Sequence, residues 1–241
     1  MRISVCCVTY NRPHLIGELI HSFEMQTFPA SDCELIILDD AGQYGNVRGT
    51  NWQVVSFPRR LVASLGEKRN ACVSMSSPKS THIVVADDDD IYLPWWLECH
   101  AKNFECSAEW SFASSVFVSF DNIIREKWSY RDDNNLLYPA HGFTKKKFWQ
   151  VGGYPHLAGW EDLYLFKKFL SIDMVHEDSL KGKQTPYLIY RRFIRERHMT
   201  HVSIDDYQSD VPQRKRTGKK STETARRTEN RFFKAWEQRS F

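Results

Sequence analysis

The chain has 241 residues, of which 41% are hydrophobic and 26% are charged. This is the composition of a globular protein, and it excludes collagen-like and wholly disordered chains. The length predicts one domain with an appended segment, and no run approaches the roughly 18 apolar residues of a membrane-spanning helix. The net charge of +3 conceals an asymmetry, because residues 191–241 carry 14 Lys/Arg against 7 Asp/Glu whereas the first 190 residues carry 19 against 23.

Cysteine usage and the first residues predict a reduced, cytosolic protein. The six cysteines form no C-x-x-C pair and no zinc-like spacing with histidine. Cys6 and Cys7 lie in an apolar run, where cysteine behaves as a small hydrophobic residue. Met1 and Arg2 lead directly into that run, without the features of a signal peptide. We therefore expect a cytoplasmic location and leave peripheral attachment to a membrane open.

Apolar periodicity in the first 105 residues predicts strands and helices in alternation. Strands are expected at 3–8, 34–38, 53–57 and 82–86, and helices at 13–26, 67–75 and 94–104. Alternation of this kind predicts an α/β fold with a mostly parallel central sheet flanked by helices.

The pattern changes beyond residue 105. Strands are expected at 111–120, 136–139 and 187–192, a turn at Gly152-Gly153, and a helix at 161–170. From about residue 205 the chain becomes polar and basic, and residues 223–236 are expected to form a basic helix. We therefore predict one α/β domain over residues 1–204 and a basic, partly helical extension over residues 205–241.

Four aspartates directly follow the buried strand expected at 82–86. In an extended chain Asp87 and Asp89 point one way, while Asp88 and Asp90 point the other. Two carboxylates at this spacing can hold one hard divalent cation and leave positions for phosphate oxygens. Open α/β sheets bind ligands at the carboxyl ends of their strands, which favours a site over the alternative of a solvated acidic loop.

Asp39 and Asp40 repeat this arrangement after the strand expected at 34–38, and they open into a loop with Gly42. A carboxylate there can accept hydrogen bonds from a nucleobase or a ribose. The alternative interpretation is that these residues only form a turn, as aspartate readily does. Two strands that both end in paired aspartates favour a ligand site.

Polar residues also follow the first strand and occupy the helix expected between the two acidic loops. The first strand is followed by Thr9, Tyr10, Asn11 and Arg12, which carry hydroxyl, amide and guanidinium groups. Lys68 and Arg69 lie on the helix, where they can neutralise a diphosphate. For each of them the alternative is an ordinary surface polar group or charge.

Two acidic residues, Glu161 and Asp162, open the last predicted helix of the α/β domain after Trp160. Acidic residues are favoured in a first helical turn by the helix dipole, which is a sufficient structural reason for them. The functional interpretation is a general base, a carboxylate that takes a proton from an attacking hydroxyl.

Five segments in this order resemble the family-2 glycosyltransferases, which have the GT-A fold. They are ISVCCVTYNRP, QTFP before ELIILDDAG, GEKRNA, HIVVADDDDIYLPWWL and GFTKKKFWQVGGYPHLAGWEDLYLFKKF, and the likeness covers roughly residues 1–170. The resemblance implies an inverting transferase that uses a nucleotide-sugar, with a UDP-sugar as the expected donor. Composition and periodicity alone imply no such activity.

The resemblance also implies roles for single residues at the nucleotide. The residues that match Thr9, Tyr10 and Asp40 line the nucleobase pocket in such enzymes, and the match to Arg69 lies near the nucleotide. We place Asn11, Arg12, Asp39 and Lys68 in the same donor site because they lie in the same segments.

The D-x-D motif of the family maps onto Asp87 and Asp89, which by resemblance hold Mn²⁺ or Mg²⁺. Asp89 is the stronger candidate for the metal ligand, and Asp88 is expected near the ribose. The alignment of the D-x-D motif with the four aspartates can shift by one residue. Some relatives have a further histidine, close to the C-terminal end of the domain, that contacts the metal or a phosphate. His198 and His201 are candidates for this residue, and we expect His198 to be the metal ligand.

Asp162 matches the catalytic base of the family, with Glu161 beside it. In the implied mechanism Asp162 deprotonates the acceptor hydroxyl, which attacks the anomeric carbon from the side opposite the departing nucleotide. One base suffices for this single inverting step, unlike the carboxylate pair of glycosidases.

The basic extension departs from the family pattern. Basic and aromatic residues interleave over 212–239, which suits a solvated extension, contact with an anionic membrane, or contact with nucleic-acid phosphates. The acceptor accordingly stays open between a glycan, a lipid-linked sugar and a hydroxylated DNA base. The alternative function is a non-catalytic nucleic-acid-binding protein that uses this tail. A nucleotidylyltransferase is disfavoured because no Gly-rich phosphate loop follows the first strand.

Overall fold

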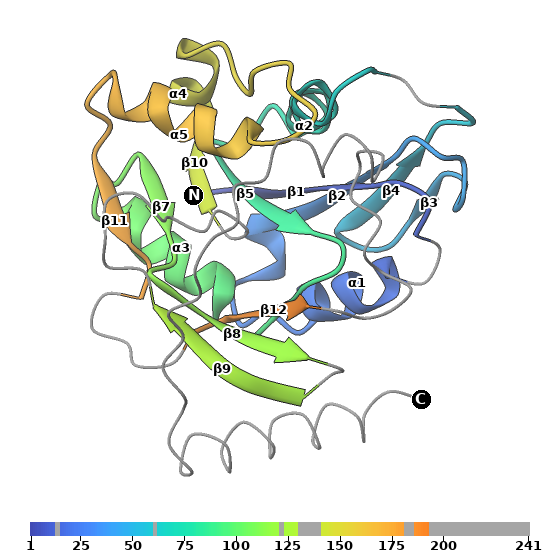
Figure 1. Cartoon of the computed structure of the whole chain (residues 1–241), viewed down its shortest axis with the longest axis horizontal. Coiled ribbons are helices and arrows are strands. Elements are labelled where there is room, and N and C mark those ends of the chain that lie inside the picture. The colour runs from blue at the N-terminus through green and yellow to red at the C-terminus, as the bar shows by residue number, and fades with distance from the viewer. Residues whose placement is uncertain (13–14, 60–61, 121–122, 130–140, 181–185, 193–241) are drawn as a thin grey trace.

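The computed structural model describes residues 1–12, 15–59, 62–120, 123–129, 141–180 and 186–192, and its centre is an eight-stranded sheet (Figure 1). In spatial order the strands are β11 (His176–Asp178), β7 (Trp110–Phe112), β10 (His141–Thr144), β5 (His82–Asp87), β1 (Ile3–Thr9), β2 (Cys33–Asp39), β4 (Trp52–Ser56) and β3 (Val47–Arg48). Strands β5, β1, β2 and β4 run parallel, whereas β10 is antiparallel to both of its neighbours. The predicted α/β fold with a mostly parallel centre is confirmed.

A second sheet, which the sequence did not predict, lies beside the first (Figure 1). Its strands are β6 (Ile91–Tyr92), β12 (Leu188–Arg192), β8 (Ser115–Phe120) and β9 (Ile123–Ser129). The prediction of one strand over 111–120 was therefore wrong, because the chain leaves the main sheet after β7 and enters the second sheet with β8. The backbone amide of Ser114 donates to Asp178 at 3.0 Å at this break, which stabilises the bend.

Helices cover both faces of the main sheet (Figure 1). One face carries α1 (Ile16–Glu24) and α3 (Trp96–Glu105), and the other carries α2 (Leu65–Ser74), α4 (Lys145–Gln150) and α5 (Glu161–Leu170). A short 3-10 turn, η1 (Ala30–Asp32), precedes β2. Helix α2 begins two residues before the predicted position because Ser64 and Glu67 cap it reciprocally.

Strand β1 lies at the middle of the core and divides it into two. Alternate side chains face opposite sides of a strand, so Ile3, Val5 and Cys7 join the cluster under α1 and α3. Cys6 and Val8 join the cluster under α2, α4 and α5. All seven residues of β1 are buried, as expected for a strand covered on both faces.

The turn at Gly152-Gly153 is confirmed and connects α4 to the segment before α5. Both glycines have positive φ, 77° and 66°, and a Cβ on Gly153 would lie 2.6 Å from the Asn70 side chain. Asn70 on α2 holds Tyr154 from both sides, since it donates to the Tyr154 carbonyl at 2.9 Å and accepts from its amide at 2.8 Å. The segment before α5 is therefore fixed to α2.

Some predictions fall outside the described residues, namely the strand at 136–139, the helix at 223–236 and the division into residues 1–204 and 205–241. Within the described part of the chain, no helix has the length and apolar character needed to cross a bilayer. The six cysteines are free thiols.

Candidate active site

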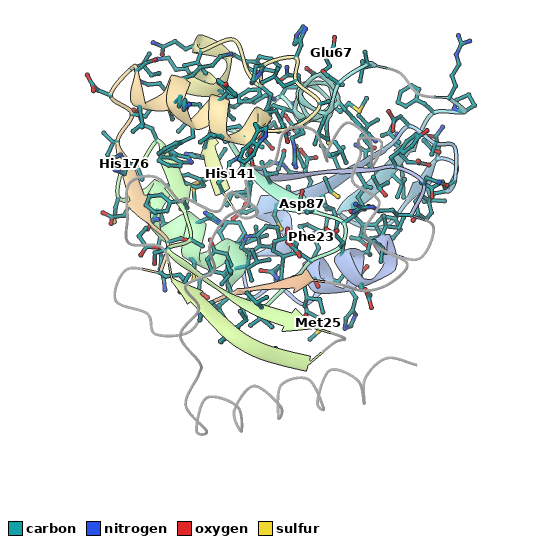
Figure 2. All side chains as sticks on the ribbon, in the orientation of Figure 1. Phe23, Met25, Glu67, Asp87, His141 and His176 are labelled. Carbon is teal, nitrogen blue, oxygen red and sulfur yellow. The ribbon has the colours of Figure 1, made fainter. Side chains whose placement is uncertain are left out.

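The carboxyl ends of β1, β2 and β5 meet at one edge of the main sheet. In the parallel register Thr9 lies opposite Asp39, and Val8 lies opposite Asp87. Figure 2 shows Asp87 near the middle of the molecule, at the end of β5, with Glu67 of α2 above it. The sheet thus brings together polar segments that lie far apart in the sequence.

The four aspartates at the end of β5 divide into two kinds. Asp88 and Asp90 are buried, each 1% exposed, whereas the side chains of Asp87 and Asp89 retain 28% and 30% of their exposure. The chain turns after Asp87, yet the four side chains still alternate between exposed and buried, as they would in an extended chain. Asp87 and Asp89 are therefore the carboxylates that a ligand at this edge can reach.

Asp88 is held from both sides by the last residue of β1 and by the segment that follows this strand. The Thr9 hydroxyl donates to it at 2.6 Å, and the Arg12 guanidinium donates to it at 2.6 Å and to Asp89 at 3.0 Å. Burial raises the pKa of Asp88, and the positive charge of Arg12 offsets part of this effect. The predicted ribose contact of Asp88 stays a prediction, and its oxygens bind protein donors here.

The carboxylates at the end of β2 are both inside the protein. Asp39 is fully buried and accepts hydrogen bonds from the amides of Ala41 and Gln43 and from the Ser56 hydroxyl, at 2.7–2.9 Å. Burial alone would raise the pKa of Asp39, but these hydrogen bonds lower it below its ordinary value. Asp39 therefore holds the loop after β2, and its predicted place in the donor site stays a prediction.

Asp40 forms a buried ion pair with Lys68 of α2. Their side chains are 1% and 4% exposed, and the Lys68 ammonium also donates to the Thr9 carbonyl at 2.6 Å. Burial lowers the pKa of Lys68, and the hydrogen bond to Asp40 counteracts that effect. The Tyr10 ring lies 5.4 Å from the Lys68 ammonium. Lys68 thus ties together the ends of β1 and β2.

Arg69 connects the end of β5 to the start of α5. Its guanidinium donates to Asp87 at 2.9 Å and to Glu161 at 3.0 Å. Burial alone would lower the pKa of Arg69, but Asp87 and Glu161 raise it well above its ordinary value. The Glu161 carboxylate is 4% exposed and satisfied by Arg69, so Glu161 is placed to position α5.

Asp162 is the partly exposed carboxylate of the pair that opens α5. Its pKa is raised to about 6, first by desolvation and next by the negative charge of Glu161, with Arg69 opposing both. A carboxylate with a pKa near the working pH is suited to act as a general base. Of the two acidic residues predicted as catalytic, Asp162 thus has the environment of a base.

The remaining predicted residues either lie at this edge of the sheet or fall outside the residues that the structure describes. Asn11 is exposed, with a φ of 53° that asparagine tolerates better than most residues. His198 and His201 lie outside the described residues. Sequence reasoning missed Tyr154, which lies with its ring 5.9 Å from the Arg69 guanidinium. The only signal for it was its place directly after the Gly152-Gly153 turn.

The carboxylates at this edge suit a divalent cation that is shared with a substrate. No group of three or more His, Cys, Asp and Glu within the described ranges is arranged to hold a metal by itself. Mg²⁺ is commonly bound by one or two carboxylates together with substrate phosphates, and Asp87 and Asp89 supply two partly exposed carboxylates. The donor set fits Mg²⁺ or Mn²⁺ held jointly with a diphosphate.

Comparison with solved structures identifies the fold as GT-A. The chain is similar to S. aureus TarS 1–349 in complex with UDP-GlcNAc, with a TM-score of 0.60 and 18% identity over 80% of this chain and 59% of that one. It is also similar to the mannosyltransferase PcManGT from Pyrobaculum calidifontis in complex with GDP-Man and Mn²⁺, with a TM-score of 0.57 and 14% identity over 82% and 58%. These likenesses concern the fold.

The chain belongs to glycosyl transferase family 2, whose model matches residues 4–171. A curated relative is an uncharacterized glycosyltransferase, YwdF, of Bacillus subtilis (strain 168), which is 29% identical over 173 residues. That match covers 70% of this chain and 56% of YwdF. The match to the family confirms the resemblance stated from the five segments.

Proposed function

We propose that the protein transfers a sugar from a nucleotide-sugar, with UDP-sugar as the expected donor, to an acceptor hydroxyl, with inversion at the anomeric carbon. The observation that carries the proposal is the Arg69 bridge. It fixes the start of α5, and with it Asp162, to Asp87 at the end of β5. A candidate base and a candidate metal ligand are thereby held at one edge of the sheet.

In this proposal Asp162 takes the proton of the acceptor hydroxyl as that oxygen bonds to the anomeric carbon. The bond from the anomeric carbon to the diphosphate breaks, and its electron pair leaves with the nucleotide. Asp162 is partly exposed, and its pKa of about 6 leaves it ionised at neutral pH yet basic enough to accept a proton. Glu161 holds Asp162 in place through Arg69 and does not take the proton.

Asp87 and Asp89 would hold Mn²⁺ or Mg²⁺ together with the donor diphosphate. The bound cation would supply positive charge that stabilises the departing nucleotide. Arg12 and Arg69 keep these carboxylates in position before the donor binds, since each donates to one of them at 2.9–3.0 Å. Thr9, Tyr10, Asp40 and Lys68 shape the floor beneath the nucleotide.

Donor hydrolysis tests the proposal without knowledge of the acceptor. The full chain is incubated with Mn²⁺ and UDP-, GDP- and TDP-sugars, and nucleotide release is followed. We expect release from one donor, with loss of about 100-fold or more in Asp162→Asn, the range for removal of a general base. Asp173→Asn is the matched control, because Asp173 is exposed just beyond the C-terminal end of α5.

Thermal unfolding in UDP plus Mn²⁺ accompanies this assay. We expect stabilisation of the wild type and of Asp162→Asn, because the base is not needed for donor binding. Asp162→Asn with wild-type nucleotide release would remove Asp162 from the role of base. Absence of both release and stabilisation would contradict the proposed function as a whole.

A further inference from the structure

One guanidinium nitrogen is shared between two aspartates of different exposure at the end of β5. The Arg12 Nη1 donates to the buried Asp88 at 2.6 Å and to Oδ2 of the partly exposed Asp89 at 3.0 Å. The Arg12 and Asp88 side chains are 8% and 1% exposed, whereas the Asp89 side chain is 30% exposed. Arg12 therefore contacts the carboxylate that the proposed function assigns to the divalent cation.

The two contacts of Arg12 differ in how readily they can be given up. An unpaired charge in the interior is costly, so the pair of Arg12 with Asp88 has to persist. The contact with Asp89 is longer and lies nearer to solvent, where an ion pair contributes little to stability. Thr9 also donates to Asp88 at 2.6 Å and keeps that carboxylate in place. The guanidinium thus has one fixed contact and one exchangeable contact.

Arg69 has a similar pair of partners but is less able to exchange them. Its Nη2 donates to Asp87 at 2.9 Å and its Nε donates to Glu161 at 3.0 Å, so two different nitrogens are held at once. Loss of either contact would break the bridge between β5 and α5. A third cation at this edge, Lys68, is buried in an ion pair of its own. Of these three cations, Arg12 is accordingly the best placed to leave a candidate metal ligand.

A divalent cation and a guanidinium compete when they bind the same carboxylate oxygen. Mg²⁺ binds carboxylate oxygens at about 2.0–2.1 Å, and two positive groups at one carboxylate repel each other. The N–H group that Arg12 withdraws from Asp89 then needs a new acceptor. A diphosphate supplies one, because guanidinium N–H groups match phosphate oxygens in geometry and charge. The cation and the nucleotide should therefore replace the Asp89 contact together.

We propose that Arg12 competes with the divalent cation for Asp89, and that Arg12 moves from this carboxylate to the donor diphosphate when the cation and the nucleotide bind. This inference rests on the proposed function, because it concerns the cation and the donor of the same site. Arg12 keeps its contact with Asp88 throughout. The consequence is that the cation and the nucleotide strengthen each other's binding, by the same factor in both directions.

Titration of Mn²⁺ into the full chain, followed by the electron paramagnetic resonance signal of free Mn²⁺, tests this without an acceptor and without turnover. We expect UDP to strengthen Mn²⁺ binding to the wild type. Arg12→Gln should bind Mn²⁺ alone about fivefold more tightly than the wild type, the factor for removal of one competing, partly exposed ion pair. The gain from UDP should shrink by about the same factor, because the guanidinium that would bind the diphosphate is gone.

A second variant separates the contact from the net charge and protects the test against misfolding. Arg12→Gln with Asp88→Asn removes the buried pair as a unit, so it leaves no unpaired charge inside and has the net charge of the wild type. This variant should also bind Mn²⁺ alone more tightly than the wild type. Arg2→Gln is the matched control, because Arg2 pairs with Glu34 at 3.8 Å and precedes β1, whereas Arg12 follows it. Its Mn²⁺ affinity should equal that of the wild type.

Equal or weaker Mn²⁺ binding in both Arg12 variants would overturn the inference, because Arg12 would then only hold Asp89 in place for the cation. Wild-type Mn²⁺ binding that does not respond to UDP would overturn it as well, and this outcome needs no variant. If the wild type still releases nucleotide from a donor in either case, only the inference fails. Absence of Mn²⁺ binding both with and without UDP would contradict the inference and the metal role in the proposed function together.

Discussion

Strands β2 and β5, which lie on either side of β1 in the main sheet, both end in aspartates, yet the two groups of aspartates have different surroundings. Asp39 and Asp40, after β2, are at most 1% exposed and bind protein partners. Asp87 and Asp89, after β5, keep side-chain exposures of 28% and 30%. The same sequence pattern therefore forms a scaffold at one strand end and a reachable pair of carboxylates at the other.

This comparison indicates that the cationic side chains around the aspartates at the end of a strand determine their role. The Lys68 ammonium is buried and neutralises Asp40 inside the protein. Arg12 and Arg69 approach Asp89 and Asp87 near the surface, where a bound cation and diphosphate can reach the same carboxylates. Substitutions at the two strand ends should therefore separate stability from ligand binding.

The largest effect on stability is expected for Asp40→Asn. This change leaves the Lys68 ammonium buried without its charged partner, which typically costs about 3–5 kcal/mol of the free energy of unfolding. Denaturant unfolding measures the loss. Glu98→Gln is the control, because Glu98 pairs at 2.8 Å with Lys102 in solvent, and no resolvable change is expected.

A double variant tests whether the loss of stability comes from the unpaired charge. Asp40→Leu with Lys68→Met replaces both charges by apolar groups and should recover much of the loss, since a buried pair is often replaceable as a unit. A stable Asp40→Asn protein that no longer binds UDP would contradict the conclusion that Asp40 mainly supports the fold. It would place Asp40 at the nucleobase, as the family resemblance implied.

The next effect is expected for Asp39→Ala. Its carboxylate satisfies the Ala41 and Gln43 amides and the Ser56 hydroxyl, and loss of a buried acceptor costs about 1–3 kcal/mol. The pKa of Asp39 is below its ordinary value, so its stabilising effect is present above about pH 4 and is lost as pH falls further. Unfolding of the variant and the wild type should therefore differ less at pH 3 than at pH 7.

Periodicity and strand-end chemistry predicted the centre of the fold and the edge that carries the site. Strands β1, β2 and β5 are short apolar runs covered on both faces, and such runs are readable from sequence alone. The second sheet was missed because the break between β7 and β8 depends on a contact of Ser114 with Asp178, 64 residues away. No local pattern encodes such a contact.

The roles within the site were only partly readable for the same reason. Asp39 and Asp87 have the same sequence context, an apolar strand followed by a further aspartate, but their partners differ. Asp39 accepts from the nearby Ala41 and Gln43 amides and from Ser56, whereas Asp87 accepts from Arg69 on α2. Glu161 and Asp162 were predicted together as catalytic. Only the contact of Glu161 with Arg69, 92 residues earlier, distinguishes the buried positioning group from the candidate base.

A smaller effect, of opposite sign, is expected for Asp162→Asn. The raised pKa of about 6 means that ionised Asp162 destabilises the folded protein above that pH, whereas below about pH 4 the group is largely protonated in both states. The variant should be more stable than the wild type by on the order of 1 kcal/mol at pH 7, with little difference at pH 3.5. Asp173→Asn should show no such pH-dependent gain.

The smallest effect on stability is expected for Asp89→Asn, although we expect this change to be the most damaging of the set to donor binding. Asp89 is partly exposed, and Arg12 keeps its closer contact with Asp88 at 2.6 Å, so unfolding should shift by less than about 1 kcal/mol. Stabilisation by UDP plus Mn²⁺ should disappear, because the reachable carboxylate pair is reduced to Asp87. Unchanged stabilisation would show that Asp89 does not hold the metal and that the two strand ends differ less than their exposure indicates.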